Sequence, residues 1–135
     1  MTTHRTNEDT GAATAFLLTG ALTLFLLLAL AIDVGLALSE KNRVFHLAQE
    51  AARIGAQEID LAAYRADGTV ALEPAAATSA GQDHLTAAEA DGDVSVTGDT
   101  VTVTAERSYT FVLLPLGTRT AGATASATPL TEPTP

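Results

Sequence analysis

The chain contains one long apolar segment, and its other hydrophobic residues are spread in short periodic patterns. Residues 11–32 carry no charged side chain, although the chain of 135 residues contains 16 Asp and Glu residues. A helix rises about 1.5 Å per residue, so this segment reaches roughly 33 Å, enough for a hydrocarbon core of about 30 Å. Its apolar side chains face every side, which indicates surrounding lipid or other apolar helices. The pattern predicts one transmembrane helix over residues 12–32.

The helical pattern continues beyond this segment. No proline occurs between residues 33 and 63, and apolar residues recur there at spacings of three, four and seven. The expected apolar face consists of Val34, Leu38, Phe45, Ala48, Ala52, Ile59 and Ala63. Charged residues such as Glu50, Arg53 and Asp60 lie on the opposite face. We therefore expect one unbroken helix to Tyr64, ended by the turn residues Asp67-Gly68.

Small residues form a stripe on the exposed part of this helix. Ala48, Ala52 and Ala56 follow one another at a spacing of four, and Gly55 lies beside them. Such a stripe lets another helix or a sheet approach closely. We expect a packing interface there, either with the protein's own sheet or with other copies or partner subunits.

The period changes in the C-terminal part. A short helix is expected from Pro74 to Ala90, because proline suits a first helical turn, and Asp91-Gly92 is expected to close it. Two alternating segments then flank Gly98-Asp99, a two-residue turn that suits paired antiparallel strands.

The turn at Gly98-Asp99 also fixes the register of these strands. It places Val96 opposite Val101 and Val94 opposite Val103, with all four valines on one face. An apolar run, residues 111–114, ends at Pro115, and a third strand follows after Leu116-Gly117. This strand places four alanines on its apolar face: Ala121, Ala123, Ala125 and Ala127.

These elements predict an α+β fold. A long N-terminal transmembrane helix extends into an exposed amphipathic helix, which packs on a small three-stranded antiparallel meander. The expected divisions are residues 1–11, a short cytoplasmic N-terminus; 12–32, the transmembrane helix; 33–66, the exposed amphipathic helix; 67–128, a small α+β domain; and 129–135, a disordered tail with three prolines.

Composition removes several function classes. The chain has no cysteine, which excludes disulfides and thiolate metal sites, and its formal net charge is −9. Such a surface disfavours nucleic acid and anionic lipid head groups as partners. No phosphate-binding loop and no Ser-His-Asp arrangement points to catalysis. We expect no catalytic residues, no cofactor and no small-molecule substrate.

Candidate metal ligands are few. His46 and Glu50 are one helical turn apart, but a third ligand is missing. Asp91, Asp93 and Asp99 cluster around two glycines and are attributed to turn chemistry, because the twelve-residue calcium loop is absent. No metal site is predicted.

Asp33 stands out as a charge at the edge of the apolar segment. Such a residue is either wetted at the membrane interface or paired with a partner, and both interpretations remain open.

The long helix followed by a meander resembles a type IV pilin. Asp33-Val34-Gly35 after the span, followed by the segment from Gln49 to Ala56, resembles the Tad (Flp) pilus-assembly proteins of the TadE and TadG type over roughly residues 8–60. The resemblance implies a minor pilin or pseudopilin, structural rather than catalytic, in the cytoplasmic membrane with its C-terminal domain outside. The implied partners are membrane lipid, other pilin-like subunits and the Tad assembly machinery with its secretion-type ATPase.

The sequence leaves alternatives open for cleavage of the N-terminus and for the orientation of the helix in the membrane. Gly11 stands where prepilin peptidases cut, but Phe16 replaces the glutamate usual at the fifth residue after the cut, which fits an accessory role better than that of the major pilin. Ala29-Leu30-Ala31 also fits a signal-peptidase site, although the apolar region is long for one. Lys41 and Arg43 lie on the side expected outside, against the positive-inside rule.

A second class of function is also weighed. The chain could be an unrelated single-span membrane protein whose outer domain binds a partner or regulates a membrane complex.

Overall fold

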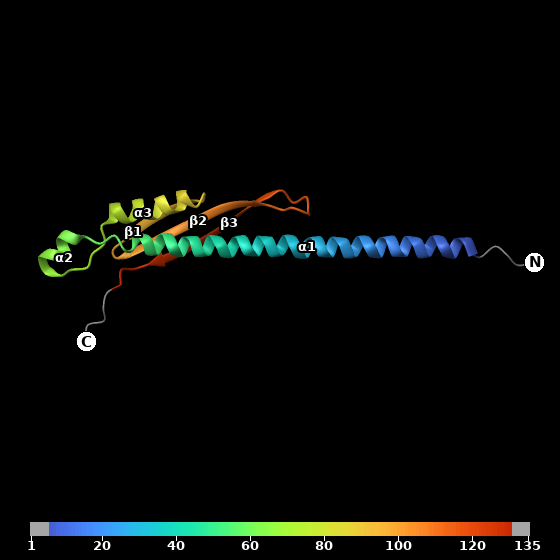
Figure 1. The fold of residues 1–135 in the computed structure, drawn as a ribbon, viewed down its shortest axis with the longest axis horizontal. Coiled ribbons are helices and arrows are strands. Elements are labelled where there is room, and N and C mark those ends of the chain that lie inside the picture. The colour runs from blue at the N-terminus through green and yellow to red at the C-terminus, as the bar shows by residue number, and fades with distance from the viewer. Residues whose placement is uncertain (1–5, 131–135) are drawn as a thin grey trace, which may run out of the picture.

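The structure is a computed structural model that describes residues 6–130, in which three helices precede three strands (Figure 1). The helices are α1 (Thr6–Gly55), α2 (Leu61–Asp67) and α3 (Pro74–Ala87), and the strands are β1 (Asp91–Thr97), β2 (Thr100–Thr110) and β3 (Thr118–Ala127). The strands form one antiparallel sheet in the order β1-β2-β3. The predicted α+β class, with a long N-terminal apolar helix and a three-stranded meander, is confirmed.

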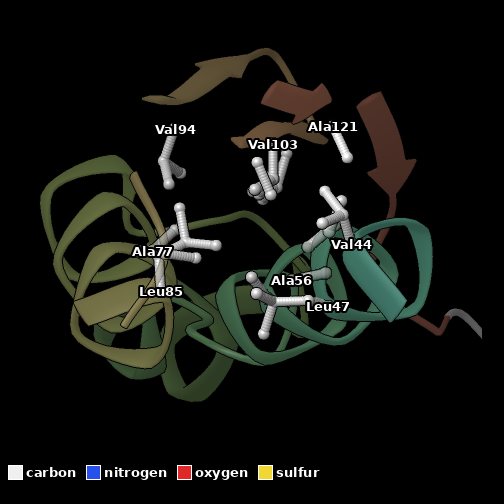
Figure 2. Packing of buried hydrophobic residues seen from close by; sticks show 14 of the residues in the cluster. Val44, Leu47, Ala56, Ala77, Leu85, Val94, Val103 and Ala121 are labelled. Carbon is white, nitrogen blue, oxygen red and sulfur yellow. The ribbon is translucent and has the colours of Figure 1, made fainter. Parts of the chain in front are cut away.

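The helices and the sheet form two layers. The C-terminal half of α1 and helix α3 contact each other and lie on the same face of the sheet (Figure 2). The N-terminal half of α1 projects beyond the domain as a single rod (Figure 1). Val44 and Leu47 of α1, Leu85 of α3 and Val101 and Val103 of β2 meet in the core between the layers.

The hairpin register agrees with the prediction. Val94 pairs with Val103 and Val96 with Val101, and Gly98 adopts a φ of 59° in the two-residue turn. Val94, Val101 and Val103 are buried, whereas Val96 is half-buried against the cluster. In β3 the predicted alanine face lies toward the core, with Ala121 buried and the three following alanines half-buried.

The long helix ends earlier than predicted. Helix α1 stops at Gly55, so the expected continuation to Tyr64 is wrong. Ile59 forms an isolated bridge with Leu72, and the Asp60 carboxylate caps α2 by accepting hydrogen bonds from the Ala62 and Ala63 nitrogens at 2.8 and 3.1 Å. Aspartate is a favoured N-cap, and here that role outweighs the place of Asp60 on a helical face. Gly68, with a φ of 77°, caps the end of α2.

The buried face of α1 is rotated from the expected one. Val34, Leu38 and Phe45 were expected to face the domain, but they are 53%, 59% and 43% exposed. Ile59 and Ala63 lie outside α1 altogether. The buried hydrophobic residues in this region instead combine the predicted alanines with neighbours one position earlier: Val44, Leu47, Ala48, Ala51 and Ala52 of α1, and Ala56 directly after it. Both α3 and the sheet contact α1, so its buried face is wider than one stripe.

The end of α3 also differs. Asp91-Gly92 does not form the expected turn, because β1 begins at Asp91 and the chain turns at Ala88 and Glu89, where Glu89 has a φ of 54°. Gly92 is required for another reason. A Cβ atom at Gly92 would overlap the carbonyl oxygen of Thr104 and lie 2.9 Å from Cδ1 of Leu85. Because β1 begins at Asp91, both Asp91 and Asp93 are strand residues.

Parts of the predicted termini lie outside the described residues. This holds for residues 1–5 of the expected cytoplasmic N-terminus and for residues 131–135 of the expected disordered tail. Pro129 and Leu130 follow β3 without regular secondary structure.

Candidate functional site

Asp33 is buried, and its carboxylate binds the backbone of a distant loop. The side chain is 1% exposed. Oδ1 accepts hydrogen bonds from the nitrogens of Val112 at 3.2 Å and Leu113 at 3.3 Å, and Oδ2 accepts from Leu113 at 3.1 Å and Leu114 at 2.7 Å. Both carboxylate oxygens are thus engaged by three successive N–H groups. Such a row of amides binds an anion well and offsets the cost of burying its charge.

The loop that holds Asp33 connects β2 to β3. We call residues 111–117 the β2–β3 tip. Its shape is fixed locally: the Phe111 nitrogen donates to the Gly117 oxygen, Leu116 donates to the Leu114 oxygen, and Gly117 has a φ of 72°. Pro115 brings no N–H of its own. The amides of residues 112–114 lie beyond the β2–β3 ladder, which ends at Thr110, and Asp33 accepts a hydrogen bond from each of them.

The β2–β3 tip lies on α1 at the edge of the apolar segment. Among residues 11–32, Ala29 alone is buried, at 2% exposure, and it lies one helical turn before Asp33 on the same face. In Figure 1 the turn between β2 and β3 points along α1 toward its N-terminal half. A small side chain at this position lets the tip approach the helix closely.

A second polar contact joins the hairpin to α1. Arg107 Nη1 of β2 lies 3.3 Å from Glu40 Oε1, and both side chains are 21% exposed. Tyr109 of β2 and Phe111 of the tip have ring centroids 5.5 Å apart in an edge-on arrangement. Two turns of α1, from Asp33 to Glu40, are thereby tied to the end of the hairpin.

The small-residue stripe lies within the protein's own core. Ala48 and Ala52 are fully buried and Ala56 is 5% exposed. A Cβ atom at Gly55 would lie 2.9 Å from the carbonyl oxygen of Ala77 in α3 and 3.0 Å from Val101 of β2. The stripe therefore lets α1 approach α3 and the sheet, and this face of α1 is covered by the protein's own core.

The apolar half of α1 is exposed. Within the described residues, α1 is the one helix long and apolar enough to cross a membrane. Its large side chains, such as Phe16, Leu24 and Leu28, are 58–79% exposed. Gly11 lies near the start of this half, with open space where a side chain would stand.

The remaining titratable residues form separate contacts. Glu50 Oε2 lies 3.6 Å from His84 Nε2 of α3, while the ring of His46 faces Phe45 at a centroid distance of 6.1 Å. Within residues 6–130 no group of three His, Asp or Glu side chains has the spacing of a metal site. At the end of α2, two hydrogen bonds from Thr69 lower the pKa of Asp67, with the larger effect from the Thr69 side chain and the smaller from its backbone.

The sequence singled out Asp33 but not the loop it binds. The partners are 79 to 81 residues away along the chain. One signal was available: the apolar run at residues 111–114 falls between two strands, where polar turn residues are usual. An apolar run at this position indicates a loop whose side chains contact apolar surroundings rather than water.

Comparison with known proteins finds a similarity in the N-terminal part of the chain. Residues 11–58 match the family model described as putative Flp pilus-assembly TadE/G-like, a region that includes the apolar helix, Asp33 and the small-residue stripe. No curated protein and no solved structure matches the chain. The α3 helix and the sheet lie outside the matched region. The similarity to the Flp pilus-assembly TadE/G-like family therefore covers residues 11–58.

Proposed function

We propose that this protein is a membrane-anchored minor pilin or assembly subunit of a Tad (Flp) pilus. The observation that carries the proposal is the TadE/G-like match over residues 11–58, which coincides with an apolar helix and its junction with a folded domain. The projecting half of α1 has the length and exposure of a membrane anchor. A structural role accounts for this architecture, so we assign the subunit no catalysis of its own.

The proposed topology places residues 1–11 in the cytoplasm, residues 12–32 in the cytoplasmic membrane and the domain outside. Support comes from the family resemblance. Lys41 and Arg43 lie just beyond the span and oppose this orientation by the positive-inside rule. Other pilin-like subunits and the assembly machinery are the proposed partners, and the polar surface of the domain is available to them.

Topology can be tested with single cysteines, because the natural chain has none. Ser95→Cys on the exposed side of β1 should react with an impermeant maleimide in cells whose outer barrier has been permeabilised. Thr3→Cys, the matched control, should react after the inner membrane is lysed. The reverse pattern would refute the orientation.

The assembly role can be tested by deleting the gene in a host that makes Flp pili. We expect few or no surface pili by electron microscopy, with the major pilin still present in the membrane, and recovery when the gene is restored. Normal pilus number and length in the deletion strain would refute the pilus-assembly role and favour a single-span protein that serves another membrane complex.

A further inference from the structure

We infer that the β2–β3 tip is a second membrane contact, inserted into the lipid beside α1 and locked there by Asp33. The inference rests on the proposed membrane anchoring of α1. It assigns the apolar side chains of the tip, Val112, Leu113 and Leu116, to the acyl-chain boundary of the leaflet next to the domain. The folded domain would then be held against the membrane at two places.

The first argument is depth along α1. Asp33 is the single charged residue between Gly11 and Leu38, and the tip covers its carboxylate. That carboxylate is hydrogen-bonded by backbone amides, and the next polar side chains of the helix are Ser39 and Glu40. Asp33 and Ser39 are separated by roughly 9 Å along the helix axis. The tip therefore lies on the lipid side of the first polar turn, within the roughly 5–10 Å depth typical of interfacial insertion.

The second argument is the composition of the tip surface. Val112 is 73% exposed, Leu113 45% and Leu116 50%, which lie within the range of 44–79% for the exposed large apolar side chains from Phe16 to Ile32. Hairpin turns in water favour Gly, Asn, Asp and Ser. An exposed apolar patch of this kind marks a membrane or protein contact. Here the patch continues the apolar surface of α1 on the same side of the polar boundary.

The third argument is the boundary itself. Tyr109 shares a shallow groove with Val34, Leu38 and Lys41 of α1. Tyrosine and lysine combine an apolar body with a polar end and are suited to the head-group region. Arg119, paired with Tyr109 across the β2–β3 ladder, is exposed beside it. These residues mark a head-group level at which the hairpin leaves the lipid.

Lipid is favoured over a second copy of the chain as the occupant. The amides of residues 112–114 are already satisfied by Asp33, and the large side chains that the tip exposes are aliphatic. Contact with acyl chains needs no complementary shape or hydrogen-bonding groups. The apolar half of α1, which faces lipid in the proposed topology, begins directly beside the tip.

The test uses the full-length protein in phosphatidylcholine vesicles, with the fluorophore NBD attached to single cysteines. Val112→Cys reports on the tip, Leu24→Cys on the span, and Asp99→Cys on the β1–β2 turn at the opposite end of β2. We expect blue-shifted emission at positions 112 and 24, quenching of both by lipids brominated on the acyl chain, and protection from aqueous iodide. Position 99 should be quenched by iodide and not by brominated lipid.

The outcomes separate the inference from the anchoring on which it rests. Lipid quenching at 24 but iodide quenching at 112 would overturn the inference and leave the anchor intact. Blue-shifted emission at 112 without lipid quenching would show that protein, such as a second copy, covers the tip, and would also overturn it. Absence of lipid quenching at both 24 and 112 would refute the anchor itself. In addition, Asp33→Asn should increase iodide quenching at 112, whereas Asp93→Asn should leave it unchanged.

Discussion

The carboxylate of Asp33 accepts a 2.7 Å hydrogen bond from the backbone nitrogen of Leu114, a residue 81 positions later in the chain. This contact joins the edge of the apolar helix to the last turn of the sheet. A carboxylate that accepts several backbone N–H groups makes charge-assisted bonds, which are about twice as strong as neutral ones. Asp33 therefore orients the domain relative to α1, in addition to marking the edge of the span.

Replacement of Asp33 should destabilise the domain. Loss of a hydrogen bond to a charged group costs about 1.5 to 3 kcal/mol, and Asp33→Ala would leave three amides without their acceptor. We expect Asp33→Ala to lower the melting temperature of the detergent-solubilised protein, with Asp33→Asn intermediate. Hydrogen exchange at the amides of residues 112–114 should accelerate in both variants. Asp93→Asn, which removes the same charge from an exposed strand position, is the control. Unchanged exchange at the tip in Asp33→Ala would contradict the role of the carboxylate.

The small-residue stripe predicts a size limit at Ala52. This residue of α1 is fully buried in the hydrophobic core. Overpacking of a well-packed core typically costs about 1 to 3 kcal/mol, so Ala52→Leu should lower the free energy of unfolding by that amount. Gln57→Leu adds a similar side chain at an exposed position and should have little effect. Equal thermal stability of the two variants would remove the packing argument.

Gly92 and Gly122 should respond differently to the same substitution. A Cβ at Gly92 would overlap the Thr104 carbonyl oxygen, whereas at Gly122 the nearest atom would be 3.6 Å away. Gly92→Ala should therefore cost about 1 to 3 kcal/mol, because the strand backbone must shift. Gly122→Ala should be neutral or stabilising by about 0.4 to 1 kcal/mol, since it restricts the unfolded chain. Calorimetric melting of the two variants in detergent would show a reversed order if this account were wrong.

Local rules predicted much of the fold. The hairpin around Gly98-Asp99 was correct in register, because a two-residue turn leaves one way to pair the flanking valines. The helix end was missed, because the sequence between Gly55 and Asp60 contains no proline, and the bridge from Ile59 to Leu72 that separates α1 from α2 is a tertiary contact. The buried face of α1 was shifted for a similar reason. Its width depends on α3, whose position beside α1 no periodicity specifies.

Asp33 shows the same limit at the candidate site. The sequence distinguishes a charge at the edge of an apolar segment, but two interpretations fit it equally. Whether water or a partner satisfies the carboxylate depends on where the β2–β3 tip lies, and that position follows from the length of β2 and its packing against α1.

The ion pair between Glu40 and Arg107 should contribute little to stability. The two side chains lie 3.3 Å apart and are each 21% exposed, so water still reaches the pair. Pairs accessible to solvent typically contribute about 0.2 to 1 kcal/mol, with screening by salt. A double-mutant cycle with Glu40→Gln and Arg107→Gln should give a coupling energy in that range at low ionic strength and a smaller one at high salt. A coupling energy that salt leaves unchanged would indicate a desolvated pair.

Intact mass of the membrane-extracted protein should show an unprocessed N-terminus. Phe16 replaces the carboxylate that prepilin peptidase substrates carry at the fifth residue after the cut, and Glu8 and Asp9 weaken the positive charge that signal peptidase substrates need. Ala29 and Asp33, which flank Ala31, are both buried in the folded protein, and this burial adds a structural reason for the folded chain to stay uncut after Ala31. A mature protein beginning at Ala12 would indicate a processed pilin. One beginning at Ile32 would release the domain from its anchor and defeat the membrane assignment.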